Sequence, residues 1–370
     1  MRKDLTMDEP SVALADSPAP TPDFSSQASA SFAPILTALG VSLGVTTYQA
    51  GKLIFVRAED DVLNTHFRDF LSPMGIAYRD GFLALGDRYS IWKFRNMAAM
   101  GVQPTDDKPH DAVFLPASRT FTGDIRIHEI GWAGDELWAV NTRFSCLSTF
   151  DGIHNFVPRW RPPFVTSYSA EDRCHLNGMC ISEGKPTIVS CHAMTDAAEG
   201  WRNHKQDGGA ILDVATGRVL AQGLCMPHSP RLHLNRLWFL ESGKGCVSSL
   251  DLLSGETRVE FELPGFTRGL DFHGRYAFVG LSQVRETAIF SGIPISESDR
   301  ERKCGIWVLD TIDKKVVAIL EFSGSVQEIF AIAVLPFIRP DVVLDREEWL
   351  EHSFFVPPDQ LPEFSPAPTE

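Results

Sequence analysis

The chain has 370 residues, of which 44% are hydrophobic, enough for a large core in one repeat fold or in two ordinary domains. Its formal net charge of −14 gives no basic footprint for nucleic acid and does not favour docking on anionic membranes. Its seven cysteines lack the paired spacing of a disulfide scaffold or a zinc motif, so we expect reduced thiols and a cytoplasmic protein.

The two ends of the chain differ in composition from its centre. Residues 1–35 are rich in Ser, Ala, Pro and Asp, and no apolar stretch precedes residue 30, so a disordered tail is expected there rather than a signal peptide. Residues 346–370 are predicted to form a Pro-rich C-terminal tail. Between them, residues 36–345 are expected to form a single domain, and no apolar run is long enough to span a bilayer.

Short apolar runs separated by turn residues fill this central region. Two strand-like runs at 45–48 and 53–57 come first, with no inner strand before them. Repeat units then begin at residues 73, 128, 175, 228, 268 and 327. Complete units consist of an apolar hairpin and further strands, one of which ends in Asp before a Gly- or Asp-containing turn. Steps of 40 to 59 residues between unit starts match a four-stranded propeller blade with variable loops.

The last unit holds one clear strand, which ends at residue 335, whereas the N-terminal strands lack an inner partner. Each end therefore completes the other, and pairing between them would remove two exposed sheet edges. We predict an all-β, six-bladed β-propeller closed by N-terminal strands pairing with the C-terminal strand. A pair of β-sandwiches is the alternative, but it does not explain the repeat.

Three histidines stand at the same place in three successive units: His128, His175 and His228. The inner strand of each propeller blade lines the central channel, so the first residues of these strands are expected to meet at one mouth. Neutral imidazole is a ligand for several divalent transition metals, and three of them with open positions suit a catalytic ion such as Zn, Mn, Fe or Cu. The alternative is a polar channel in which each ring binds water or a carbonyl group.

Other polar residues stand in or beside the same position. Arg268 and Gln327 occupy it in the next two units, and an arginine there matches a carboxylate or phosphate, although an ion pair with Glu328 is the alternative role. Further candidates for binding the substrate are Arg231 and Asn177. Candidates for acid–base catalysis are Glu129, Glu328 and His192, the last of which could also be a fourth ligand or a structural residue.

The loops around His175 offer fewer predictions. We expect Asp172 and Arg173 to pair with each other and fix a blade edge. Trp201 and Arg202 should form either a lid or a disordered surface loop in the 193–209 insertion. The chain has no Gly-rich phosphate loop, Gly-x-Ser-x-Gly elbow or His-Glu-x-x-His pair, so serine-hydrolase and nucleotide-binding functions have no support.

Four stretches together resemble a known family: DRCHLNG at 172–178, MPHSPR at 226–231, LPGFTRGL at 263–270 and VGLSQVRE at 279–286. They resemble an uncharacterised bacterial family of conserved hypothetical proteins with a domain of unknown function. The resemblance covers nearly all of the chain outside the tails and implies a propeller-like fold, but it transfers no activity. That family tends to place Asp where this chain has Ala331, which implies a weaker site if that Asp served it.

Two functions follow from these patterns. The first is a metal-dependent enzyme (lyase, hydrolase or oxidoreductase) acting on a small anionic molecule at the channel mouth. The second is a non-catalytic propeller scaffold, which would bind a protein partner through its rim.

Overall fold

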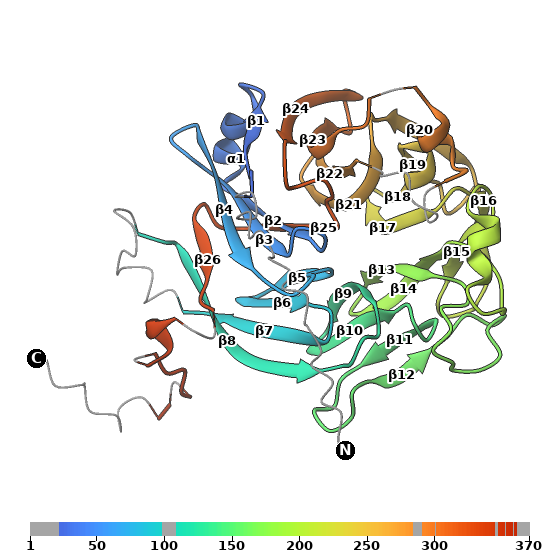
Figure 1. The fold of residues 1–370 in the computed structure, drawn as a ribbon, viewed down its shortest axis with the longest axis horizontal. Coiled ribbons are helices and arrows are strands. Elements are labelled where there is room, and N and C mark those ends of the chain that lie inside the picture. Colours follow the sequence, from blue (N-terminus) through green and yellow to red (C-terminus); the bar gives the residue numbers. More distant parts are fainter. Residues whose placement is uncertain are drawn as a thin grey trace, which may run out of the picture.

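The computed structural model describes residues 22–97, 109–283, 291–299, 301–344, 347–351, 353–357 and 359–360. Its strands form six sheets arranged around a central axis (Figure 1). The predicted six-bladed propeller is therefore confirmed. Residues 1–21, 361–370 and the Arg285-Glu286 end of the fourth family-like stretch lie outside the described residues.

The first three blades, from the channel outwards, are built as follows. Blade 1 contains β25 (Ala331–Leu335), β2 (Ser42–Thr47), β3 (Lys52–Glu59) and β4 (Val62–Asp69). Blade 2 contains β5 (Ile76–Arg79), β6 (Phe82–Gly86), β7 (Ser90–Asn96) and β8 (Ala112–Phe121). Blade 3 contains β9 (Ile127–Ala133), β10 (Glu136–Asn141), β11 (Cys146–Thr149) and β12 (Val157–Trp160).

The other three blades repeat this order. Blade 4 contains β13 (Leu176–Ser182), β14 (Lys185–Cys191), β15 (Gly209–Asp213) and β16 (Val219–Leu224). Blade 5 contains β17 (Pro227–His233), β18 (Arg236–Glu241), β19 (Cys246–Leu250) and β20 (Thr257–Glu262). Blade 6 contains β21 (Phe266–His273), β22 (Tyr276–Ser282), β23 (Cys304–Asp310) and β24 (Lys315–Phe322).

Blade 1 closes the ring. Its inner strand β25 pairs antiparallel with β2, with a register that runs from Ser42 opposite Leu335 to Thr46 opposite Ala331. The predicted closure by N-terminal strands is therefore confirmed. It leaves no open edge between the first and the last blade of the ring.

The predicted N-terminal tail contains ordered elements. β1 (Ser26–Ala28) adds a fifth strand to blade 6 along β24, and α1 (Phe32–Leu39) follows it (Figure 1). Phe32 and Leu36 are fully buried in a core cluster between blades 1 and 6. These apolar side chains explain why order begins before residue 35, although the flanking residues have the composition of a tail.

A short strand after the ring attaches to blade 2. β26 (Pro340–Val342) pairs parallel with β8, and its buried Asp341 reaches across to β4 of blade 1. The Asp341 carboxylate accepts hydrogen bonds from Arg68 Nε at 2.8 Å and Arg68 Nη2 at 2.5 Å, and Nε2 of His66 lies 3.1 Å from it. This cluster ties blade 2 to blade 1, the blade that closes the ring.

The core lies between neighbouring blades. One cluster, for example, packs Ala84 and Ile91 of blade 2 against Ile127, Ile130 and Leu137 of blade 3. All seven cysteines are buried and form no disulfide. The other helices of the described residues are one turn or little more: α2 (Pro294–Glu297), η2 (Gly200–His204), η3 (Ser242–Lys244) and η4 (Glu348–Glu351). Among the described residues, no helix has the length and apolar character needed to cross a membrane.

Hydroxyl groups join the blades close to the channel. Near the end of the second strand of four blades, a Ser or Thr hydroxyl donates to a backbone carbonyl at the inner strand of the next blade. The four bonds are Thr46 to Met74 (2.5 Å), Thr142 to Leu176 (2.5 Å), Ser242 to Thr267 (2.5 Å) and Ser282 to Ile329 (3.1 Å). They hold the starts of the inner strands, and so the mouth of the channel, in a fixed arrangement.

Candidate functional site

A cavity of about 290 Å³ opens at this mouth. Its walls come from the starts of the inner strands and from the loops beside them. The lining residues are Tyr48, Met74, Arg126, His128, His175, His192, Trp201, Arg202, Met226, His228, Phe266, Arg268 and Phe330. We call this cavity the chamber. Four of the eleven histidines line it, together with Arg268.

The four imidazole rings form a continuous row. His128 meets His175 edge to face with ring centroids 4.8 Å apart, and His175 stacks on His192 at 4.5 Å. His192 meets His228 edge to face at 4.8 Å, with their Nε2 atoms 3.3 Å apart. The structure therefore brings together the three histidines that the repeat singled out, and it inserts His192 between His175 and His228.

His128 and His228 are held in the same way in two different blades. Nδ1 of His128 lies 3.1 Å from the Arg126 carbonyl oxygen and 2.8 Å from Thr142 Oγ1. Nδ1 of His228 lies 3.0 Å from the Met226 carbonyl oxygen and 2.7 Å from Ser242 Oγ. In both cases the hydroxyl belongs to a residue 14 positions after the histidine. The carbonyl belongs to a residue two positions before it, with left-handed backbone (φ 53° and 50°).

These contacts fix the tautomer of both rings. Each hydroxyl already donates its proton to a carbonyl of the next blade, so it can only accept from the imidazole. The proton of the neutral ring therefore resides on Nδ1, and the lone pair is on Nε2. Left-handed non-glycine residues cost on the order of 1–3 kcal/mol and gather at functional sites, where the surrounding structure compensates for the strain.

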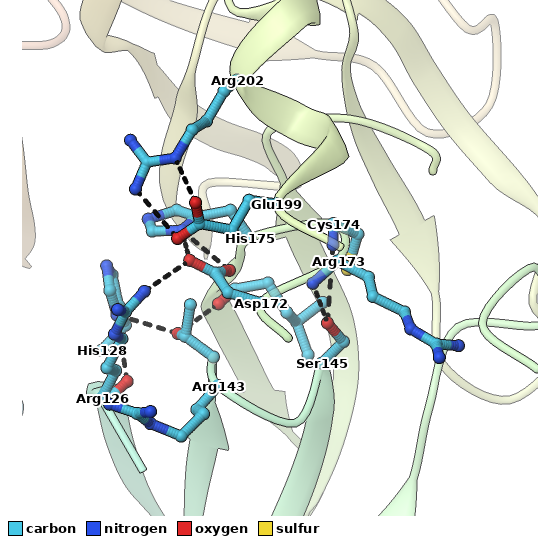
Figure 2. Close-up of polar contacts among 12 residues, drawn as sticks. Arg126, His128, Arg143, Ser145, Asp172, Arg173, Cys174, His175, Glu199 and Arg202 are labelled. Atoms are coloured by element: carbon cyan, nitrogen blue, oxygen red, sulfur yellow. Dashed lines mark hydrogen bonds and ion pairs between the residues drawn. The ribbon is translucent and has the colours of Figure 1, made fainter. Parts of the chain in front are cut away.

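A carboxylate holds the third ring. Both oxygens of the buried Asp172 lie within 3.0 Å of His175 Nδ1, which places a proton on Nδ1 of this ring as well (Figure 2). Asp172 also accepts a hydrogen bond from Arg126 Nη1 at 2.9 Å. The predicted Asp172–Arg173 pair is therefore wrong. Arg173 instead bonds to Glu171 and Asp196, because it points away from His175 (Figure 2).

His192 takes the place that a bridging hydroxyl has in other blades. It directly follows β14, as Thr142 follows β10 and Ser242 follows β18. Its Nδ1 atom is buried and has no hydrogen-bond partner in the part of the chain that the structure describes, whereas its Nε2 faces His228. The predicted candidate is thus at the centre of the row.

Burial sets the protonation of the cluster. It lowers the pKa values of His128, His192 and His228 well below the usual 6.5, and the neighbouring imidazoles and Arg268 lower them further by charge repulsion. These three rings are therefore neutral at physiological pH, which is the form that binds metals.

Arg268 lies on the wall next to His228. Its guanidinium covers the Phe330 ring at 3.7 Å from the centroid, and its side chain is only 10% exposed. The nearest carboxylate oxygen, Glu328 Oε1, is 3.7 Å from Nη1, an ion-pair contact that is too long for a hydrogen bond. Burial raises the pKa of Glu328 to about 7, against the opposing effect of Arg268. Arg268 thus lines the chamber, whereas Glu328 lies beside Arg268 and is not one of the lining residues, and the alternative Arg268–Glu328 pair forms only as this long contact.

Three other predicted residues lie deeper in the channel. Glu129, Asn177 and Arg231 line a cavity of about 20 Å³ below the histidines, large enough for about one water molecule. Glu129 forms an ion pair with Arg231 and accepts a hydrogen bond from the Met179 amide at 2.8 Å. Because this pair crosses the channel below the chamber, neither residue lines the chamber as we had expected of a catalytic or substrate-binding group.

Gln327 is outside both cavities. Its side chain donates to the Gly324 carbonyl at 3.1 Å, in the turn before β25. The strand begins only at Ala331, so Phe330 rather than Gln327 lines the chamber. The prediction that Gln327 binds the substrate is therefore not supported by its position. Ala331 lines the deeper cavity.

The connection from β14 to β15 covers the chamber. It contains η2, whose Trp201 is 2% exposed and packs on His175 with ring centroids 4.3 Å apart. On one side, the Thr166 hydroxyl donates to Asp196 at 2.6 Å; on the other, Gln206 Nε2 donates to the Gly292 carbonyl at 2.6 Å. These contacts agree with the predicted lid and not with the alternative of a disordered surface loop.

Several lining residues escaped the sequence reasoning. Tyr48, Met74, Met226, Phe266 and Phe330 are apolar or aromatic residues like many others in the strands. Thr142 and Ser242 could have been found from the sequence as partners of His128 and His228. Each hydroxyl residue follows its histidine by 14 positions, and the same spacing recurs in two repeat units.

The four histidines of the row have the donor chemistry of a metal centre but not its full geometry. Within the ranges that the structure describes, no group of three or more His, Cys, Asp or Glu side chains is positioned to hold a metal ion. The donors nevertheless have suitable chemistry: four imidazoles, three with Nδ1 tied to an oxygen, which is how proteins commonly orient metal-binding histidines. The Nε2–Nε2 distance of 3.3 Å also matches two ligands of one tetrahedral ion at about 2.0–2.1 Å, which lie roughly 3.3–3.4 Å apart.

Comparison with solved structures supports the architecture. The chain resembles one from the crystal structure of a nidogen/laminin complex, with a TM-score of 0.52 and 12% identity over 80% of this chain and 99% of that one. It also resembles a protein of unknown function from Bacteroides caccae, with a TM-score of 0.50 and 11% identity over 80% of this chain and 98% of that one. At such identities the likeness concerns the fold alone.

No curated protein matches the sequence. Residues 30–344 match the family described as a domain of unknown function (DUF4915). The matched region covers the ring, the histidine row and the cover over the chamber, and on this basis the chain belongs to the DUF4915 family.

Proposed function

We propose that the histidine row binds a divalent transition metal and that the chamber is the substrate site of a metal-dependent enzyme acting on a small anionic molecule. The observation that carries this proposal is the orientation of the rings. In His128, His175 and His228 the Nδ1 proton is held by oxygen atoms, so the Nε2 lone pairs remain available. Binding by more than two rings requires the stacked His175 to turn relative to His192.

The donor set defines the chemistry of such a centre. Imidazoles are neutral, so a bound Zn, Mn, Fe or Cu ion would keep its positive charge and could polarise a substrate oxygen or activate water or dioxygen. Arg268 supplies a second positive charge on the wall, to which an anionic group can bind. Both features favour an anionic substrate.

Glu328 is the residue best placed for proton transfer. With a pKa of about 7 it exists in both protonation states at neutral pH, as a general acid or base should. Its carboxylate lies beside Arg268, so it would act close to the anionic group of the substrate. Trp201 covers the imidazoles, and this limits the access of bulk water to the site.

Metal titration of chelator-treated protein tests the proposal. We expect one equivalent of Zn²⁺, Mn²⁺, Fe²⁺ or Cu²⁺ to bind, and His228→Ala and His192→Ala to abolish or strongly weaken that binding. His154→Ala is the matched control, because His154 is exposed and remote from the chamber. Absence of stoichiometric binding, or equal binding by wild type and both cluster variants, contradicts the proposal.

The scaffold remains the alternative function. It predicts that a partner captured by the wild-type rim is retained equally by the His192→Ala variant, and that no metal binds. A metal-binding wild type whose cluster variants lose the ion would favour the enzyme.

A further inference from the structure

The walls of the chamber combine aromatic side chains with few available charges. Tyr48, Trp201, Phe266 and Phe330 contribute aromatic surface, and Met74 and Met226 add flexible apolar surface. Among the described residues that line the cavity, none is acidic. Its volume of about 290 Å³ is near the lower end of the roughly 300–1,000 Å³ typical of ligand pockets, so the ligand must be small.

Three arginines line the chamber, but two of them already have carboxylate partners. Arg126 donates to Asp172 at 2.9 Å, and Arg202 donates to both oxygens of Glu199 at 3.0 and 3.1 Å (Figure 2). Each of these charges is largely neutralised within the protein. They shape the entrance rather than offer a free binding site.

Arg268 differs from the other two. With the described residues it forms no hydrogen bond, and its only ion pair is the 3.7 Å contact with Glu328. A guanidinium has five N–H donors, and those of Arg268 that face the chamber are open to a ligand. A planar carboxylate on the ligand would satisfy two of them at once.

We infer that the chamber binds a small monocarboxylate whose body is flat and apolar, such as an aromatic acid. The carboxylate pairs with Arg268, and the ring lies against the aromatic walls formed by Trp201, Phe266 and Phe330. This inference deepens the proposed function by naming the substrate class of the same site. It disfavours sugars, which need many polar partners, and polyanions, which need more than one uncommitted cation.

Ring-to-ring contact is the reason for a flat body. Aromatic pairs gain free energy beyond the area that they bury when they stack offset or edge to face. The wall already contains such contacts, since Trp201 packs on His175 and His192, and Phe266 meets His228 edge to face at 5.8 Å. A planar ligand extends this packing, whereas a puckered ring of equal size does not.

Isothermal titration calorimetry with sodium benzoate tests the inference directly. We expect binding at one site per chain. Cyclohexanecarboxylate tests the flat shape, benzamide tests the charge, and citrate and inorganic phosphate test the preference for a single carboxylate. Each of the four should bind at least roughly tenfold more weakly than benzoate.

Variants locate the bound carboxylate. Arg268→Gln should weaken benzoate binding at least roughly tenfold, and Arg268→Lys should restore part of it, because the charge returns without the two-pronged geometry. Arg159→Gln is the matched control, because this substitution removes the same charge from a residue on the outer strand β12. Melting temperatures of all variants establish that they are folded.

The design separates this inference from the proposed metal. Benzoate is titrated into chelator-treated protein, so its binding does not depend on an ion, whereas the metal titrations contain no benzoate. Failure of benzoate to bind, unchanged binding by Arg268→Gln, or tighter binding of citrate or phosphate overturns the inference and leaves the metal result untouched. Loss of metal binding alone overturns only the proposed function.

Discussion

Three histidines of the row should make the metal-free protein sensitive to mild acid. Because the folded pKa values of His128, His192 and His228 lie well below the usual 6.5, the unfolded chain takes up protons before the folded protein does. Their contribution to stability is therefore fully present above about pH 6.5 and is lost as the pH falls below it.

An upper limit on this loss of stability follows if the folded rings stay neutral throughout the pH range. A histidine that stays neutral when folded, with an unfolded pKa of about 6.5, loses about 1.4 kcal/mol between about pH 7.5 and about pH 5.5. Three such residues lose at most about 4 kcal/mol. A domain of about 310 residues has an unfolding entropy of roughly 0.65 kcal/mol/K, so the melting temperature should fall by at most about 6 °C from this cause.

Thermal melts in the presence of a chelator measure this loss. His192→Asn removes one of the three residues and should reduce the fall in melting temperature between the two pH values by about a third. His204→Asn, which changes an exposed histidine, should leave the fall as it is in wild type. An equal fall in wild type and His192→Asn would refute the reasoning that the fold holds these rings neutral.

Two further predictions concern buried carboxylates. Asp172→Asn removes the charged partner of His175 and should weaken metal binding by about 10- to 100-fold in calorimetric titrations; affinity equal to that of wild type would show that Asp172 does not orient this ring. Asp341→Asn leaves Arg68 with Glu347 as its only charged partner among the described residues and should cost about 2–3 kcal/mol, or roughly 3–5 °C in melting temperature. Although burial opposes its ionisation, hydrogen bonds from His66 and Arg68 hold the pKa of Asp341 well below its usual value, so this difference should shrink as the pH falls below about 4. As a control, Glu136→Gln breaks the exposed ion pair with Arg159 and should change the free energy of unfolding by no more than about 0.5 kcal/mol. A similarly small change for Asp341→Asn would contradict the role of Asp341 in holding blades 1 and 2 together.

The sequence was sufficient for the architecture because a propeller repeats its pattern. Turn residues and apolar runs recurred at blade spacing, and the incomplete units at the two ends identified the closing blade. The boundaries of the tails were less predictable. Whether Phe32 and Leu36 are ordered depends on a core between blades 1 and 6, whose residues come from opposite ends of the chain.

Prediction of the site succeeded where residues share one register and failed where a strand starts late. His128, His228 and Arg268 lie in comparable places on β9, β17 and β21, so their convergence followed from the repeat. Gln327 was assigned to the same place, but β25 begins four residues later and Phe330 lines the chamber there. For Glu129 and Arg231, sequence could not reveal that the two would pair across the channel and so leave the chamber.

The seam between β2 and β25 joins residues about 290 positions apart, such as Ser42 and Leu335. Contacts at such separations form late and slow folding, because a long loop must close first. Phe330, which directly precedes β25, contacts both His128 and Arg268. The chamber therefore acquires its last wall only when the ring closes, and a chain that has folded its middle blades holds the histidines without an enclosed pocket. Any ligand of the chamber binds the closed ring in preference to the open one, so occupancy and resistance to opening at the seam rise together.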